Sequence, residues 1–357
     1  MASGLSKRIL FLSFVALTIV SVLILLFTYT FEDNDNYKPV FFERDAKRFT
    51  ILLWTPFFSE RDYIPATSLE NCKHQNCVFT SERNHYDSAD AVIFHLRDVR
   101  TDDLPKYRPS SLQRWVLLNH ESPVHSPREE LAALNGLINW TATYRQESEI
   151  FLSPRVTKLD QRSIVDNNIN HNRSGYVVQL VSNCNTPGNR EKFVTELRKH
   201  IDVDIYGRCG DKQCLPKMST ECYHNLSSKY FFYLSFENSI CRDYVTEKFF
   251  SILDYPIVPV VFGGADYDKL APPHSYIDAL AAGNPKKLAE KLKKLIEHPE
   301  EYDKYFEWKN NYAMRMQSHP CQLCNLLNEP TEESKSWTNL IEWWFDQASC
   351  SSWKASH

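Results

Sequence analysis

Two continuous apolar runs, at residues 230–236 and 257–262, dominate the middle of the chain. Unbroken runs of this length are typical of strands that are buried on both faces of a parallel sheet. Between them lie a polar segment, 237–244, and a helical pattern that begins near Val245, and the pair Gly263-Gly264 closes the second run. Strand, helix and strand together predict a βαβ unit. Because ligands bind beyond the carboxyl ends of parallel strands, we predict the functional site in the polar segment.

Similar patterns recur on both sides of this unit. They predict five more strands, at residues 50–54, 90–95, 115–118, 176–181 and 203–206, and helices at 189–200, 284–298, 300–317 and 332–346. The apolar pattern is interrupted between Pro154 and Ser174, where asparagine and basic residues replace it. A length of 357 residues suits two domains of ordinary size. We therefore predict an α/β fold with domains at 49–165 and 166–330, and a last helix within 331–357 that packs back on the body.

The N-terminal segment predicts a membrane anchor. Residues 9–31 carry no charge, and about 20 apolar residues suffice to cross a bilayer as a helix. Lys7 and Arg8 precede this run and Glu32 follows it, so residues 1–8 are expected in the cytosol and the bulk of the chain in the lumen. The polar residues 32–48 are interpreted as a stem. A cleaved signal peptide is the alternative, although the run is longer than the apolar core of a usual signal peptide and lacks a small-x-small end.

Composition narrows the possible functions. The formal net charge is -4, which gives no general basic field for nucleic acid. The chain has only nine glycines and lacks the patterns GxGxxG and GxxxxGK[ST]. A dinucleotide site of the Rossmann type and a P-loop therefore have no support in the sequence.

Cysteines and sequons agree with a lumenal address. Ten cysteines form an even set, and several are closely spaced, such as Cys321 and Cys324. In an oxidising compartment such pairs predict disulfides, whereas a zinc site at Cys321-x-x-Cys324 would need a second pair that is not evident. Candidate N-glycosylation sequons occur at Asn139, Asn172 and Asn225.

A first group of candidate catalytic residues follows the predicted strand 115–118. Glu121 lies at the carboxyl end of that strand, where a carboxylate can act as general base towards a sugar hydroxyl. A glutamate that caps the following turn, which Pro123 fixes, is the simpler structural alternative. His120 and His125 are rival bases, although an isolated histidine is more often structural.

A second group of candidates lies in the second predicted domain. Asn183 and Arg190 flank a helix start, where helix amides and a guanidinium suit a diphosphate. Lys248 can neutralise charge on a departing phosphate, and Glu247 can accept hydrogen bonds from ribose hydroxyls. The structural alternatives are a solvated arginine and an exposed Glu-Lys pair on a helix.

Several of these segments match blocks of a known family. Residues 236–249 read FENSICRDYVTEKF and residues 258–263 read VPVVFG, while residues 121–126 and 139–145 contain ESPxHS and NWTxTYR. With these blocks the chain resembles the α1,3-fucosyltransferases of glycosyltransferase family 10. The resemblance covers residues 117–324 well and residues 49–110 loosely.

The resemblance implies a GT-B fold, with two Rossmann-like domains that face a cleft. It implies that the first domain binds the glycan acceptor and the second binds GDP-fucose, in the Golgi membrane with the catalytic part in the lumen. Fucose would be transferred with inversion to the 3-hydroxyl of GlcNAc, with Glu121 as base. By the same analogy Arg190 and Lys248 bind the diphosphate, and the side chains that hold phosphate, fucose and ribose are Asn238, Tyr244 and Glu247.

The resemblance further implies that no metal cofactor is required and that a divalent cation is at most stimulatory. Asp102-Asp103 is not a DxD motif. The chain departs from the family where Glu147-Ser148-Glu149 is followed by FLSPR at 151–155 instead of a PYG sequence. Two acceptors stay open, N-acetyllactosamine and the innermost GlcNAc of N-glycans. A catalytically silent, lectin-like Golgi protein of the same fold is the alternative function.

Overall fold

The computed structural model describes residues 47–161, 169–216, 219–315, 318–329 and 335–355. The predicted membrane span at 9–31 and most of the predicted stem lie outside these residues. Among the helices that are described, none is long and apolar enough to cross a membrane. Residues Arg48–His357 form one unit by their contacts, and the description below concerns this unit.

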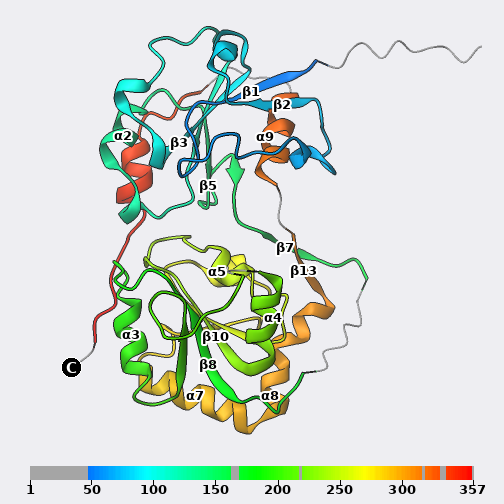
Figure 1. Cartoon of the computed structure of the whole chain (residues 1–357), viewed down its shortest axis with the longest axis vertical. Helices are drawn as coiled ribbons and strands as arrows, with labels where there is room; N and C mark the ends of the chain where they lie inside the picture. The colour runs from blue at the N-terminus through cyan, green and yellow to red at the C-terminus, as the bar shows by residue number, and fades with distance from the viewer. Residues whose placement is uncertain (1–46, 162–168, 217–218, 316–317, 330–334, 356–357) are drawn as a thin grey trace, which may run out of the picture. The chain divides into compact units, whose positions relative to one another are not determined.

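The first sheet has six parallel strands in the order β2-β1-β3-β4-β5-β6. The strands are β1 (Phe49–Leu53), β2 (Cys77–Thr80), β3 (Ala91–His95), β4 (Arg114–Leu118), β5 (Trp140–Thr143) and β6 (Ile150–Phe151) (Figure 1). Alternate residues reach opposite faces, as strand geometry requires. Leu52 packs with helix α2 (Arg128–Ala133), whereas Ile51 and Leu53 pack with helix α9 (His319–Asn328).

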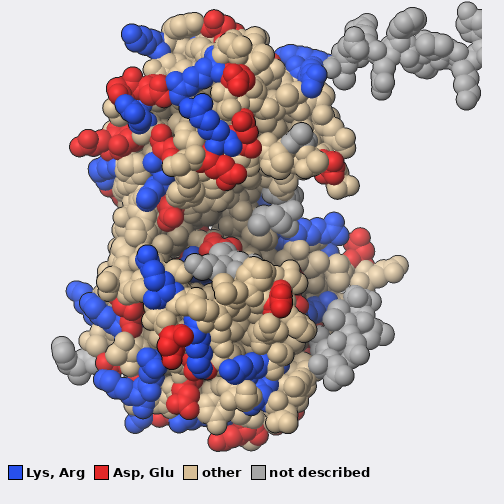
Figure 2. All heavy atoms as spheres, viewed as in Figure 1, with Lys and Arg blue, Asp and Glu red and all other residues tan. Residues whose placement is uncertain are grey.

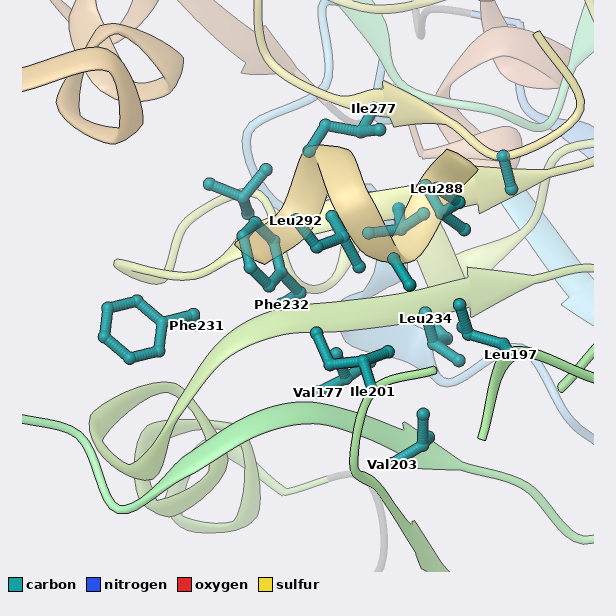
Figure 3. Close-up of a cluster of buried hydrophobic side chains, with 14 of the residues drawn as sticks. Val177, Leu197, Ile201, Val203, Phe231, Phe232, Leu234, Ile277, Leu288 and Leu292 are labelled. Atoms are coloured by element: carbon teal, nitrogen blue, oxygen red, sulfur yellow. The ribbon is translucent and has the colours of Figure 1, made fainter. Parts of the chain in front are cut away.

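The second sheet has five parallel strands in the order β12-β11-β10-β8-β9. The strands are β8 (Gly175–Leu180), β9 (Val203–Tyr206), β10 (Tyr230–Phe236), β11 (Val258–Phe262) and β12 (Ile277–Asp278). Helices α3 (Arg190–Leu197) and α7 (Pro285–Glu297) cover the face that contains Val177 and Phe232. Figure 3 shows this cluster, with Leu288 and Leu292 of α7 beside the strands. Helix α4 (Thr220–Lys229) covers the other face, at Val178 and Tyr233.

These findings confirm the predicted α/β fold and the strands that the apolar runs indicated. The central βαβ unit is present, because β10 pairs with β11 in parallel and helix α5 (Glu247–Phe250) lies between them. Helices α3 and α7 agree with the predictions for 189–200 and 284–298 within a few residues. The limits of the two predicted domains stay a prediction.

The helix predicted at 300–317 is wrong in its second half. Helix α8 (Pro299–Asp303) and a 3₁₀ segment (Lys304–Asn310) are followed by β13 (Tyr312–Arg315), which pairs with β7 (Arg155–Lys158) in an antiparallel ribbon. Tyr312 and Met314 both pack against the cluster that contains Phe250 and Val261. Residues 312–315 form a strand because they pair with β7, and this tertiary contact overrides the local helical pattern.

The helix predicted at 332–346 is also shorter than expected. Residues 330–334 lie outside the described part, and the helical end is a single π-type turn at Glu342–Asp346. Trp337 is not helical, because its backbone N–H donates to Ile138 O and its carbonyl accepts from Gly136 N. Trp343 and Trp344 are buried in the cluster of the first sheet, so this segment does pack back on the body.

All ten cysteines form disulfides: Cys72–Cys321, Cys77–Cys324, Cys184–Cys209, Cys214–Cys222 and Cys241–Cys350. The alternative of a zinc site at Cys321 and Cys324 is therefore wrong. These two residues tie α9 to β2 and to the loop before it, which places a C-terminal helix on the first sheet.

Candidate active site

The strand order of the second sheet identifies a binding position by topology alone. From β8 the chain moves to β9 on one side and then to β10 on the other side, so the order reverses between β8 and β10. Ligands of open parallel sheets bind at such switch points, outside the carboxyl ends of the strands. Arg190 follows β8, and the segment 237–248 follows β10. The structure thus brings both predicted donor-binding groups to one switch point.

Arg190 is the first residue of α3 and is only 4% exposed. Its guanidinium donates to the carbonyl of Phe236 at 2.5 Å and to the carbonyl of Asn183 at 3.1 Å, while Nε has no partner among the described residues. Burial lowers the pKa of Arg190, and the charge of Glu237 partly opposes this shift. A buried guanidinium that retains its charge and one free donor suits an anionic ligand. The solvated-surface interpretation of Arg190 is wrong.

Lys248 lies in the first turn of α5 amid carboxylates. Its Nζ is 2.8 Å from Thr246 Oγ1, 3.3 Å from Glu237 Oε2 and 3.2 Å from Glu247 Oε1. Burial alone lowers the pKa of Lys248, but Glu237 and Glu247 outweigh it and the net pKa is raised. Lys248 therefore stays a cation at this switch point.

Glu237 contacts both Thr246 and Lys248, although it is not among the site residues predicted from the sequence. Its side chain is fully buried, and its carboxylate accepts hydrogen bonds from the backbone N–H and the hydroxyl of Thr246. Burial raises the pKa of Glu237, and the charge of Lys248 opposes the increase. A polar residue directly after a fully apolar strand was the available signal, because such a position is buried. Lys248 is therefore held by a buried carboxylate rather than standing free on a helix.

Asn238 and Tyr244 are the remaining residues of the predicted donor site. We call this group the donor corner, and its members are Arg190, Glu237, Asn238, Tyr244, Glu247 and Lys248. The backbone carbonyl of Asn238 accepts from Gly188 N at 2.9 Å, which ties the loop before α3 to the segment after β10. Tyr244 is 2% exposed, and its ring lies 4.9 Å from that of Tyr144. Burial raises the pKa of Tyr244 well above its usual value, and the charges of Glu237 and Glu121 add to the increase. Tyr244 is thus a neutral phenol with Glu121 nearby.

The loop after β4 presents Glu121. Asn119 is fully buried, and its side-chain oxygen accepts from Glu121 N at 3.2 Å while its amide donates to Ser126 Oγ at 2.9 Å. The next residue, Ser122, is buried with its Oγ 2.8 Å from Ser239 Oγ. This contact joins the loop of Glu121 to the donor segment across 117 positions of sequence. The Glu121 carboxylate itself is half-buried.

The two histidines near Glu121 differ from a free general base. Burial lowers the pKa of His125, the charge of Glu121 partly opposes this shift, and the charges of Arg97 and Arg190 add to it. Burial lowers the pKa of His120 to about 4, and His319 adds to the shift. Both are neutral at physiological pH. His120 and His319 border a cavity of about 300 Å³ whose other walls include Tyr144, Thr246 and Glu247.

The acidic triplet at 147–149 has structural contacts. Arg145, which is fully buried, and Arg242 both pair with Glu147. Glu149 accepts from the backbone N–H of Thr141 at 2.7 Å. The departure from the family pattern after Glu149 therefore lies at β6 and the turn beyond it, whose carbonyl at Phe151 accepts from Gln322 of α9.

The described part of the chain contains no group of three or more His, Cys, Asp or Glu residues that would hold a metal ion. Among the three sequons, Asn139 is 5% exposed, and its Nδ2 donates to Lys335 O at 3.2 Å. A glycan on this nitrogen does not fit the folded chain. Asn172 and Asn225 are exposed and stay candidates.

Comparisons with known proteins identify the family of the chain. Residues 170–344 match the model of the family described as glycosyltransferase family 10 (fucosyltransferase), C-terminal, and residues 46–154 match that described as fucosyltransferase, N-terminal. The chain is 32% identical to alpha-(1,3)-fucosyltransferase C of Drosophila melanogaster, over 83% of this chain and 78% of the relative. It is also 32% identical to 4-galactosyl-N-acetylglucosaminide 3-alpha-L-fucosyltransferase 9 of Bos taurus, over 85% and 84%.

A further relative is glycoprotein 3-alpha-L-fucosyltransferase A of Drosophila melanogaster, which is 34% identical over 79% of this chain and 58% of its own. The fold matches the crystal structure of an alpha1,3-fucosyltransferase with GDP-fucose, with a TM-score of 0.54, 16% identity, and coverage of 81% of this chain and 92% of that chain. The chain therefore belongs to glycosyltransferase family 10, the fucosyltransferases, and is a glycosyltransferase.

Proposed function

We propose that this protein transfers L-fucose from GDP-β-L-fucose to the 3-hydroxyl of a GlcNAc residue in glycoprotein or glycolipid glycans, with inversion at the fucose C1. The observation that carries the proposal is the contact between Ser122 and Ser239, which sets the loop of Glu121 beside the donor segment that contains Lys248. Two segments that meet in the fold thus supply a general base and a cation that can stabilise the leaving diphosphate. Related chains that carry the name 3-alpha-L-fucosyltransferase support the linkage.

The proposed reaction is a single displacement. The Glu121 carboxylate accepts the proton of the acceptor 3-hydroxyl, and the hydroxyl oxygen forms a bond to C1 of fucose from the face opposite GDP. The bond between C1 and the β-phosphate oxygen breaks, and the electron pair leaves with GDP. Arg190 and Lys248 stabilise the charge that develops on the diphosphate. Asn238, Tyr244 and Glu247 contact phosphate, fucose and ribose in this proposal.

We further propose that the reaction requires no metal cofactor, since the buried Arg190 and the half-buried Lys248 would neutralise the leaving group in this proposal. The proposed location is the Golgi membrane, in a type II orientation with residues 9–31 as anchor. Five disulfides support an oxidising lumen as the location of the folded part. Lysine, arginine and acidic side chains are interspersed over the face shown in Figure 2.

The test uses a secreted fragment that begins at Glu32, with GDP-fucose and two acceptors, N-acetyllactosamine and a trimmed N-glycan core, each with and without EDTA. Product masses should rise by one fucose on at least one acceptor, and transfer should survive EDTA. Two relatives of nearly equal identity have names that specify different acceptors, so both acceptors are needed. Glycan binding without any transfer would instead support the lectin-like protein.

The base assignment has a separate test. Glu121→Gln preserves size and backbone contacts but cannot accept the proton, so the transfer rate should fall by about 10²–10⁴-fold while GDP affinity is unchanged. The backbone N–H of Glu121 donates to Asn119 Oδ1, and the substitution does not change this contact, so the loop should keep its conformation. Unchanged turnover of this variant would contradict the role of Glu121.

A further inference from the structure

The first sheet has a switch point of its own, and the donor site does not use it. From β1 the chain moves to β2 on one side and then to β3 on the other, so the strand order reverses between β1 and β3. The residues beyond the carboxyl ends of these strands are Phe57 and Phe58 after β1, and His95 and Asp98 at the end of β3. By the rule that places the donor on the second sheet, this edge is a second binding position.

Backbone strain occurs at this edge. Phe58, Ser59 and Asp62 have φ values of 49°, 72° and 51°, in the left-handed region that residues other than glycine rarely adopt. The carboxylate of Asp98 accepts the N–H groups of Phe58 and Ser59 at 2.8 and 3.3 Å, which offsets the cost. Strained residues that a buried scaffold holds in place occur mainly at binding and catalytic sites.

The strained turn presents an aromatic ring. The side chain of Phe58 is 50% exposed, while its backbone N–H donates to Asp98. Its centroid lies 4.9 Å from those of Phe57 and His95, and Phe57 lies 5.2 Å from His120. A continuous row of rings therefore leads from the exposed Phe58 to His120.

The row ends at the 300 Å³ cavity that His120 and His319 border. Their ring centroids are 6.3 Å apart, and each has a buried ring nitrogen without a partner among the described residues, Nδ1 of His120 and Nε2 of His319. Burial lowers both pKa values to about 4, so both rings are neutral. A neutral imidazole has one donor and one acceptor nitrogen, which suits a hydroxyl group better than an anion.

These features differ from those of the donor corner, which has cations for a diphosphate. Rings with apolar faces and neutral polar groups fit an uncharged, hydroxyl-rich ligand, because the C–H face of a pyranose is apolar and its rim carries hydroxyls. The cavity is at the small end of ligand sites, which span about 300–1,000 Å³. Its walls include Glu247 of the donor corner and His120, which directly precedes Glu121 in the sequence.

We propose that Phe58, His120 and His319 determine acceptor specificity: one acceptor sugar ring packs on Phe58, and the two imidazoles hydrogen-bond hydroxyls of the sugar that lies in the cavity. This inference rests on the proposed fucosyl transfer and deepens it. Phe57 and Asp98 act as positioning residues that hold Phe58 and His120 in place. The two rings at the cavity come from distant segments, since His319 begins α9 and His120 follows β4.

The test measures steady-state transfer by the full chain, with KM determined separately for the acceptor and for GDP-fucose. His319→Phe and His120→Phe should each raise the acceptor KM about five- to tenfold, the value of one neutral hydrogen bond, and leave the GDP-fucose KM unchanged. Phe58→Leu should raise the acceptor KM similarly. Tyr176→Leu is the matched control, because Tyr176 is a 42% exposed aromatic ring on β8.

Monodeoxy acceptor analogues separate recognition from a structural role. For the analogue that lacks the hydroxyl bound by His319, wild type and His319→Phe should have the same acceptor KM, and His319→Gln should recover part of the loss on the parent acceptor. Equal effects on every analogue, a raised GDP-fucose KM, or an unchanged acceptor KM with a lower melting temperature would each overturn the inference. If the wild-type protein transfers fucose and the variants have the wild-type acceptor KM, only this inference is refuted. If the wild-type protein transfers no fucose, the proposed function is refuted as well.

Discussion

At the scale of single residues, Lys248 combines two roles that a substitution can separate. Its Nζ pairs with Glu237 inside the protein and is proposed to meet phosphate outside it. Lys248→Met should weaken GDP binding about 10–100-fold, the usual range for charge-assisted hydrogen bonds, and should leave guanosine binding unchanged. Calorimetric titration with the two ligands measures the difference.

Lys248→Arg is the control, since it keeps the charge near Glu237 and should retain most of the GDP affinity. An equal loss of guanosine and GDP affinity in Lys248→Met would mean that the lysine only maintains the fold of this corner. A fall in thermal stability is expected in either case, because the variant leaves Glu237 buried without its cation.

The buried histidines predict an acid-sensitive stability. Their folded pKa values are about 4, whereas an unfolded histidine titrates near about 6.5. Between these values the unfolded chain binds more protons, so the free energy of unfolding should fall as the pH falls through this window and be independent of these groups above about pH 6.5. Melting temperatures from pH 7 to pH 4 measure this dependence.

His319→Gln removes one of the two titrations, so its melting temperature should fall less steeply than that of wild type over the same range. His224→Gln, at an exposed position of α4, should follow wild type. A parallel acid dependence of wild type and His319→Gln would show that His319 does not contribute.

At the scale of elements, the four-residue helix α5 depends on its cap more than on its own hydrogen bonds. Thr246 is the N-cap, its hydroxyl accepts from Lys248 N and Nζ, and its own N–H is held by Glu237. Thr246→Val keeps the shape but removes the hydroxyl. We expect a loss of about 1 kcal/mol of stability and a several-fold rise in the KM for GDP-fucose, because Lys248 loses a support.

Thr246→Ser retains the hydroxyl and should restore both quantities. Thermal melts and donor kinetics on the two variants provide the measurement. A variant Thr246→Val that loses stability but keeps the wild-type donor KM would show that the cap holds the helix without positioning Lys248.

The accuracy of the sequence predictions also differed between elements: strands with long apolar runs were predicted better than short segments. The strands predicted from apolar runs were correct to within a residue or two, because a strand that is apolar on both faces has few other ways to fold. The short buried strands β5 and β6 were not predicted. Residues 311–315 were misassigned to a helix, since Tyr312 and Met314 become strand positions through pairing with β7 and packing against the cluster that contains Phe250 and Val261. The pattern of a short segment does not determine its structure when a distant cluster supplies its packing.

At the scale of the whole molecule, two disulfides join distant parts of the chain. Cys72–Cys321 and Cys77–Cys324 span 249 and 247 positions, while Cys214–Cys222 spans only 8. Replacement of all four cysteines of these two disulfides by serine should lower the free energy of unfolding by about 2–5 kcal/mol, because either disulfide alone still closes the long loop. These disulfides also hold α9, which carries His319. Replacement of Cys214 and Cys222 by serine should lower the free energy of unfolding by less, since a disulfide that closes a shorter loop constrains the unfolded chain less.

Chemical denaturation of the two variants, one without both long-range disulfides and one without Cys214–Cys222, provides the comparison. The variant that lacks both long-range disulfides should also show a higher acceptor KM with an unchanged GDP affinity, because α9 begins at the cavity rather than at the donor corner. An equal loss of stability in both variants would contradict the dependence on loop length.

The sequence by itself determined the α/β class, most buried strands, and the identity of Glu121, Arg190 and Lys248 as chemically suited groups. These conclusions follow from local patterns and from motifs that lie within short segments. Only the tertiary structure decided that Arg190 is buried, that Glu237 holds Lys248, and that Ser122 meets Ser239. It also placed His319 beside His120, across 199 positions of sequence. Burial and pairing between distant segments depend on how sheets and disulfides close the chain, and no local pattern encodes that closure.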